Sequence, residues 1–165
     1  MGTYLKNLLE HPVYKKQLHR LERYESERVF CKHDASHFEE MGRIAVAMMK
    51  KYGVEMEEET VWLAAYLHDM GRVAQYENGT PHDKAGTVFA RRMLQEIGYP
   101  ENKSEEIIAL IDGHRSGGSD MPVRIFAWAD KRSRACYACE QAAACKWSDE
   151  RKNRYAFEDL EAEQL

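Results

Sequence analysis

The chain has 165 residues, of which 44% are hydrophobic and 32% charged, and its net charge is −4 at pH 7. This length suits a single domain that buries roughly two thirds of the surface of its unfolded chain. The slightly acidic balance excludes a global basic surface for a nucleic-acid backbone, so an anionic partner would have to be bound by local groups.

The first residues, MGTYLKNLLEHPVYKK, have neither the apolar core nor the small-residue cleavage site of a secretory signal. Lys6 stands where a myristoylation motif has Ser or Thr, and no apolar run approaches the roughly 18 residues of a membrane helix. We therefore expect a cytoplasmic protein with no membrane partner. In that compartment the four cysteines are expected to be thiols or metal ligands rather than disulfides.

Apolar residues recur at helical spacing along the chain, and no stretch shows the alternation of a strand. Pro12 suits the first turn of a helix. The next helix is predicted from about 36 to 53, and another from about 60 to 69, where Gly71 breaks it. Residues 76–81, YENGTP, contain turn formers and a proline and are predicted to be a loop.

Three further helices are predicted towards the C-terminus. One spans about 82–97, and the next is capped by Asn102 or Ser104. The last restarts at Pro122 and continues into the cysteine region, and the charged tail from Ser148 is expected to pack loosely. The sequence thus predicts an all-α fold, a single bundle of about six to eight helices.

Histidines and aspartates stand at the predicted helix ends, beside apolar stripes where a solvated side chain is unexpected. Burying a group that can carry charge costs several kcal/mol unless a partner or a metal compensates it. Imidazole and carboxylate together suit Fe, Mn, Co, Ni or Zn, and suit Mg less well. Because Asp69 directly follows His68, its carboxylate could bridge two ions while the histidine binds one. The candidate metal ligands are His37, His68, Asp69, His82, His114 and Asp130.

The order His37, then His68-Asp69, then Asp130 resembles the H…HD…D signature of the HD-domain metal-dependent phosphohydrolases. The segment AYLHDMGR resembles their central LHDIGK segment. The resemblance implies a single HD domain over residues 1–165. It would consist of an N-terminal helical extension (1–30), an HD core (31–131) and a C-terminal cysteine-containing helix with a charged tail (132–165).

Two further histidines, in PHDKAG and in IDGHR, resemble those of the binuclear branch of this family. The resemblance implies a mono- or binuclear centre of divalent transition metal. In the binuclear case, one ion would be held by His37, His68, Asp69 and Asp130, and the other by Asp69, His82 and His114.

The resemblance also implies metal-assisted hydrolysis of a phosphate ester in a nucleotide or another small phosphorylated metabolite. Asp69 and Arg72 are the expected catalytic residues. Arg72 replaces the lysine of many relatives and adds a fork suited to phosphate oxygens. The candidate substrate-binding residues are Arg72, Arg115, Lys131 and His33; each cation could instead be an ordinary solvated side chain, and His33 could instead support His37.

Two other functions stay open. The same six ligands would serve an HD-type di-iron oxygenase, because some HD-fold proteins with this ligand set activate oxygen. Alternatively, the chain is a non-catalytic sensor or interaction module that uses the metal only for folding. A homo-oligomer is compatible with the sequence.

The cysteines form a second candidate site. Cys136, Cys139 and Cys145 have the spacing C-x-x-C-x5-C, and Cys31 lies two residues before His33. Together they could hold a separate zinc ion or an iron–sulfur cluster, or they could be buried core thiols of a helix. The segments Phe30–Asp34 and Ser133–Cys139 resemble a subset of small bacterial HD proteins, and that resemblance implies no activity.

Overall fold

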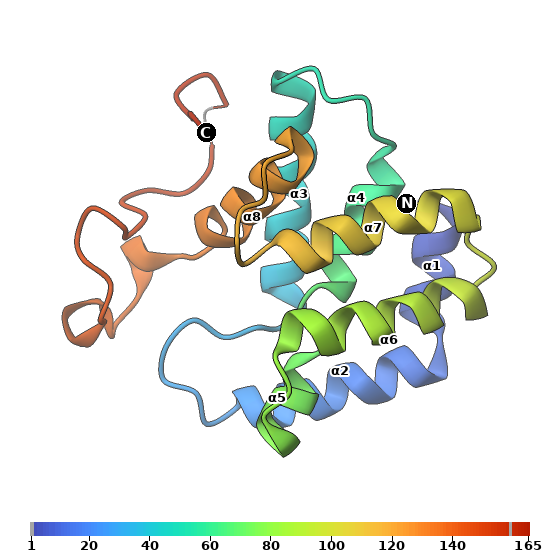
Figure 1. Cartoon of the computed structure of the whole chain (residues 1–165). Helices are drawn as coiled ribbons and strands as arrows, with labels where there is room; N and C mark the ends of the chain where they lie inside the picture. Colours follow the sequence, from blue (N-terminus) through green and yellow to red (C-terminus); the bar gives the residue numbers. More distant parts are fainter. Residues whose placement is uncertain (1, 159) are drawn as a thin grey trace.

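The computed structural model describes residues 2–158 and 160–165, and within them the chain is all-helical with no strand (Figure 1). The predicted all-α class is therefore confirmed. No helix in the described ranges is both long and apolar enough to cross a membrane. The helices are α1 (Thr3–Glu10), α2 (Pro12–Glu25), α3 (Ala35–Lys51), α4 (Glu58–Leu67), α5 (Arg72–Asn78), α6 (His82–Glu96), α7 (Glu101–Gly113) and α8 (Met121–Arg132), followed by the short 3-10 helices η1 (Cys136–Ala138) and η2 (Ala142–Ala144).

The core of the bundle is formed by α3, α4, α7 and α8. Helix α3 packs on α4 and α8, and α7 packs on α4, α6 and α8. The N-terminal helices α1 and α2 cover the outside of α4 and α5, as the blue ribbons of Figure 1 show. Fully buried side chains such as Phe38, Leu63 and Phe126 fill the space between these layers. Burial of the apolar stripes, rather than helix propensity alone, stabilises helices of this length.

The predicted helices agree with the structure where an apolar stripe faces the core. Helix α2 begins at Pro12, as predicted, and α6 begins at His82. Helix α3 is capped by Asp34, whose carboxylate accepts a hydrogen bond from the backbone N–H of His37 at 3.1 Å. This cap fixes where α3 starts and therefore where His37 stands.

Two predicted boundaries are wrong. Residues 76–78 lie in α5 and not in a loop, because α5 rests on both α2 and α6 and buries Val73. The turn comes only at Gly79, which has a φ of 79°. Helix α7 begins at Glu101, so neither Asn102 nor Ser104 is its cap.

The last helix was predicted to continue into the cysteine region. This prediction is wrong, because α8 ends at Arg132. The side chain of Asn153 donates hydrogen bonds to the carbonyls of Lys131, Arg132 and Arg134 at 2.9, 3.1 and 2.7 Å. The carbonyls of Lys131 and Arg134 also accept from the backbone N–H groups of Arg134 and Cys136, so Asn153 adds to the partners of the carbonyls at the helix end. A residue distant in sequence therefore supports the end of α8, and the cysteines after it lie in the short turns η1 and η2 and beside them.

The charged tail is held against the bundle and is not loosely packed. Phe157 is only 5% exposed and lies under the guanidinium of Arg43, 5.2 Å from the ring centre. The ammonium of Lys51 donates to the carbonyls of Leu160 and Glu163 at 2.7 and 2.6 Å. Arg132 and Glu163 form a buried ion pair. The tail thus covers one side of α3 and α8.

Gly71 does not itself end α4, which stops at Leu67, but it permits a close backbone contact. A Cβ atom at Gly71 would lie 2.0 Å from the carbonyl oxygen of His82 and 2.3 Å from the backbone nitrogen of Gly86. The turn after α4 therefore touches the first turns of α6, and this contact brings His82 next to the His68-Asp69 pair.

We predict that Phe157→Ala lowers the free energy of unfolding by about 3 kcal/mol, because it removes a large buried side chain and leaves a cavity. The control is Tyr155→Ala. Tyr155 is 58% exposed, and its ring lies against the guanidinium of Arg132, so its loss should cost less than about 1 kcal/mol. Urea unfolding measures both values, and equal losses would contradict the tail's place in the core.

Candidate metal centre

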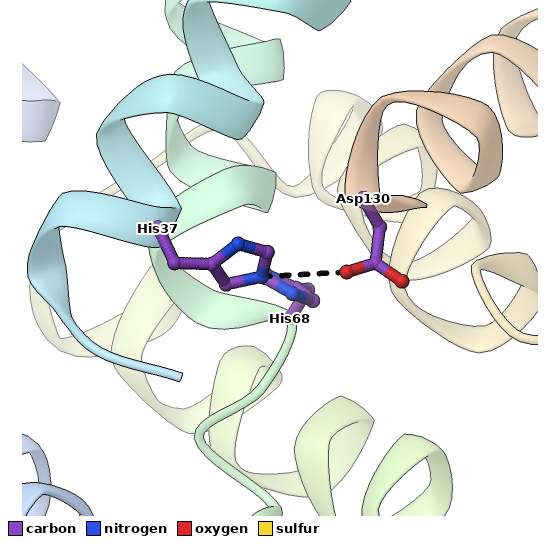
Figure 2. A group of neighbouring side chains, drawn as sticks. All are labelled: His37, His68 and Asp130. Atoms are coloured by element: carbon purple, nitrogen blue, oxygen red, sulfur yellow. Dashed lines mark ion pairs between the residues drawn. The ribbon is translucent and has the colours of Figure 1, made fainter. Parts of the chain in front are cut away.

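The six candidate ligands meet in the interior of the bundle, each carried by the end of a helix. All six side chains are buried, and they form two groups whose potential ligand atoms lie within 4.8 Å of one another. Figure 2 shows the first group, with His37 from α3, His68 from the end of α4 and Asp130 from α8 pointing towards one another. The second group consists of Asp69, His82 and His114.

Asp69 connects the two groups. Its Oδ2 atom lies 3.2 Å from Nε2 of His68, which belongs to the first group. Its Oδ1 atom lies 3.6 Å from Nε2 of His82, which lies 3.2 Å from Nε2 of His114. In the first group, Nε2 of His37 lies 3.3 Å from Oδ1 of Asp130. The carboxylate of Asp69 therefore has one oxygen directed towards each group.

The Nδ1 atoms of the four histidines face outward and are held by partners. Nδ1 of His68 is 2.7 Å from the carbonyl of Ala65, and Nδ1 of His114 is 2.5 Å from that of Ile111. Nδ1 of His82 contacts Gln75 Oε1 at 2.8 Å, and Nδ1 of His37 contacts Ser133 Oγ at 3.1 Å. A carbonyl partner requires a proton on Nδ1, which leaves the Nε2 lone pair free as in metal-binding histidines.

Several buried polar atoms at the centre have no hydrogen-bond partner among the described residues. They are Nε2 of His37 and of His68, both carboxylate oxygens of Asp69, and Nε of Arg72. Although Arg72 Nε lies 2.7 Å from Oδ1 of Asp69, the pair lacks the geometry of a hydrogen bond. Such buried groups are costly to leave unsatisfied. Imidazole lone pairs and carboxylate oxygens directed at the same space fit a divalent transition metal.

The electrostatic environment favours the protonation states that metal ligands require. Burial would raise the pKa of Asp69, but His68 and then Arg72 hold it well below its usual value. The pKa of Asp130 is lowered in the same way by His37 and Arg134, against the effect of burial. Burial and then Arg72 lower the pKa of His82 to about 3. Ionised carboxylates and neutral imidazoles are the ligand forms that bind metals.

His68 differs from the other histidines. Burial would lower its pKa, but Asp69 overcomes that effect and raises it above the ordinary value. A proton on His68 therefore compensates the buried Asp69 carboxylate, and a bound cation would take the place of that proton.

The predicted substrate-binding residues do not all reach the centre. Arg72 is adjacent to Asp69, and Nε2 of His33 lies 3.8 Å from Oδ2 of Asp69. Arg115 is half exposed and pairs with Asp83 at 3.1 Å. Lys131 is exposed, and its ammonium donates to the carbonyl of Ala127 in its own helix at 3.0 Å. Adjacency to Asp130 in the sequence does not direct the lysine side chain towards the centre.

Sequence reasoning missed two residues that support the centre. Arg134 is largely buried, and its Nη2 lies 3.2 and 3.4 Å from the two oxygens of Asp130. Glu25 is buried beside His33, with its Oε2 atom 3.0 Å from both the backbone nitrogen and Nδ1 of His33. The SR pair before the cysteines was a signal for Arg134, whereas nothing in the sequence distinguishes Glu25 from the other glutamates.

The four cysteines are free, half-buried thiols, and no group of three potential ligands in the described residues includes any of them. All four line one cavity of about 390 Å³, whose wall also contains His33 and His37. The metal centre therefore borders an opening on its His37 side.

Comparisons with known proteins agree with this geometry. A sequence model of the HD domain matches residues 34–135. An uncharacterized protein of Clostridium beijerinckii is 36% identical over 146 residues, which cover 88% of this chain and 93% of that protein. The crystal structure of a predicted HD superfamily hydrolase from an uncultured Thermotogales bacterium is similar in fold, with a TM-score of 0.61 and 20% identity, over 92% of this chain and 87% of that one. The predicted division into extension, core and tail stays a prediction.

We predict that Glu25 makes the fold sensitive to acid. Burial alone would raise its pKa, but hydrogen bonds from His33 and Tyr76 lower it from 4.5 to about 2. A lowered carboxyl pKa stabilises the fold above the unfolded value of 4.5, and this contribution of about 3 kcal/mol disappears as the pH falls towards about 2.

The measurement is urea unfolding between neutral pH and pH 2 of the wild type and Glu25→Gln. The stability difference between them should shrink across this range. The matched control is Glu27→Gln, which changes an exposed glutamate two residues further along the chain. A pH-independent difference for Glu25→Gln would contradict the prediction.

Proposed function

Because this chain belongs to the HD-domain family, we propose that it is a metal-dependent phosphohydrolase that cleaves a phosphate ester of a nucleotide or another small phosphorylated metabolite. The observation that carries the proposal is the pair of buried ligand groups connected by the carboxylate of Asp69. A fold stabilised by one structural metal would not need a second buried group with the same chemistry. The printed name of the Thermotogales relative, a predicted hydrolase, is consistent with it.

The donor set favours Fe, Mn, Co, Ni or Zn over Mg, because four of the six ligands are imidazoles. Under this proposal His37, His68 and Asp130 hold one ion, His82 and His114 hold another, and Asp69 contributes to both. Metal bound there would lower the pKa of a coordinated water and neutralise charge on the phosphoryl oxygens.

Arg72 is the proposed phosphate-binding residue. Its side chain is only 14% exposed and lies against Asp69, so it enters the centre with little water around it. A guanidinium can donate two parallel hydrogen bonds to phosphate oxygens, and Nε of Arg72 lacks a hydrogen-bond partner. His33, on the other side of Asp69, would help to position the substrate.

Arg115 and Arg134 would contribute positive charge at a greater distance from Asp69 than Arg72 does. Arg115 pairs with Asp83, the neighbour of His82, at the exposed side of the second ligand group. Arg134 neutralises Asp130 beside the cavity that reaches His37. We propose that these cations attract an anionic substrate, whereas Lys131 has no part in this arrangement.

The experiment is a screen for phosphate release from nucleotides, dinucleotides and sugar phosphates, with Mn, Fe, Co and Mg compared in parallel. Oxygen consumption is followed in the same reactions. Phosphate release without oxygen uptake would support the phosphohydrolase. Oxygen uptake with iron would favour the di-iron oxygenase, and tight metal binding without any turnover would favour the sensor module.

We predict that Asp69→Ala lowers metal affinity and hydrolysis each by more than about 100-fold, since outer-sphere residues alone contribute up to that much. Metal binding is measured by calorimetry, and far-UV circular dichroism should show that the chain stays helical. The control is Glu105→Ala, which removes an exposed carboxylate paired with Arg91 and should change neither quantity. Full activity of Asp69→Ala would refute the assignment.

We predict that Arg72→Ala lowers kcat/KM about 100-fold, because it removes a charged donor to the transferred phosphoryl group. Metal affinity should stay equal or rise, since a cation next to the ligands is lost. Arg72→Lys should restore part of the activity, as it keeps the charge but not the fork. An unchanged kcat/KM in Arg72→Ala would mean that the arginine only neutralises Asp69.

A further inference from the structure

The cysteines converge although they are far apart in the sequence. Cys31 lies in the loop before α3, whereas the other three follow α8, and all four line the same cavity of about 390 Å³. Each is half buried and free. Cysteines that served only as small core residues would be fully buried, as is usual for this residue type.

The turns after α8 direct their thiols to one side. Cys136, Cys139, Ala142 and Cys145 are spaced by three residues, and all four line the cavity. The 3-10 helices η1 and η2 explain this register, because side chains three residues apart are eclipsed in a 3-10 helix. Of the intervening residues, Glu140 and Gln141 are exposed and lie outside the cavity lining, whereas Tyr137 is exposed and also borders the cavity.

This segment has no hydrophobic core of its own. None of residues 133–156 is fully buried, although the chain there is folded into defined turns. Short segments without a core usually depend on disulfides or a metal for their stability. The three cysteines are among the least exposed residues in this segment, and the structure contains no disulfide.

Cys31 adds a second, independent sign of a site. It is the only non-glycine residue with a positive φ in the described ranges, at 35°. This conformation costs about 1–2 kcal/mol for a residue with a Cβ. Strained backbone of this kind is typical of ligand-binding positions.

Cations lie beside the thiols. Arg134 lines the cavity and contacts Cys31. Lys152 lines the same cavity, which also has the carboxylates of Asp34 and Glu40 in its wall.

The spacing of the sulfurs is compared with what two occupants require. In a tetrahedral zinc site with Zn–S bonds of about 2.3 Å, the sulfurs lie about 3.8 Å apart. No three of the four sulfurs lie within 4.8 Å of one another. In a four-iron cluster each thiolate binds a different iron, which requires wider spacing.

We propose that Cys31, Cys136, Cys139 and Cys145 bind an iron–sulfur cluster of the four-iron type, beside the centre formed by the histidines and aspartates. The cluster assembles from sulfide and equal amounts of ferrous and ferric iron, so no further oxidant is needed. Each thiol loses its proton to solvent, and its sulfur forms one bond to iron. The cluster joins the loop before α3 to the turns after α8. Because this loop carries His33 and the turns carry Arg134, the cluster holds two residues that contact Asp69 and Asp130.

The test uses the full chain in the Asp69→Ala background, so that iron at the other centre does not contribute. The protein is reconstituted anaerobically with sulfide and equal amounts of ferrous and ferric iron, and iron, acid-labile sulfide and visible absorption are measured. We expect about four irons and four sulfides per chain. Cys139→Ala should lose most of both, whereas Ala142→Ser, a change in the same cavity wall, should keep them.

Circular dichroism establishes that each variant is folded before its cluster is counted. A parallel sample is given zinc alone. Uptake of about one zinc per chain there, with no iron and sulfide bound in the reconstituted sample, would overturn the proposal, and so would the absence of bound iron and sulfide by itself. Equal loss in Cys139→Ala and Ala142→Ser would also overturn it. Since sulfide reports only on the cysteine site, failure here is distinct from failure of the phosphohydrolase.

Discussion

The buried carboxylate of Asp69 is the constraint on which the rest of the structure depends. An ionised group inside a helical bundle is costly unless charges and donors compensate it. His68, Arg72 and His33 approach it from three directions, yet neither oxygen finds a hydrogen bond. The compensation is therefore electrostatic and incomplete. A cation in the same space would complete it, and this is why the arrangement suits a metal better than a purely structural ion-pair network.

Backbone packing brings the ligands to this point. The helices that carry them are held by apolar stripes that the sequence displays, and their termini coincide with the ligands. The approach of α6 to the turn after α4 depends on Gly71 and Gly86, whose missing side chains leave room for backbone contact. Gly71 was expected to break the helix, whereas α4 already ends at Leu67 and the glycine allows a close backbone contact. A sequence shows a break in periodicity but not the neighbour that occupies the space.

Features that depend on the local sequence could be predicted, whereas features that depend on a distant neighbour could not. His37 and Asp130 were recognisable because polar residues beside apolar stripes are unusual. Helix α5 was missed because it is short and is held by its packing on α2 and α6, where it buries Val73. The end of α8 is supported by Asn153, and the order of the tail depends on Lys51 and Arg43. For Lys131, adjacency to Asp130 in the sequence does not carry the side chain to the ligands, because neighbouring residues of a helix point about 100° apart.

Arg134 lies between the metal centre and the cysteine cavity. Its guanidinium lies against the carboxylate of Asp130 on one side and against Cys31 on the other. If the cysteines bind a cluster as thiolates, as proposed, Arg134 would be shared between them and Asp130, and a change of charge at the cluster would alter how strongly Arg134 compensates Asp130. Because Asp130 lies 3.3 Å from His37, that change would reach the ligands themselves. Arg134 would then couple the cysteine cavity to the metal centre, whatever substrate the centre acts on.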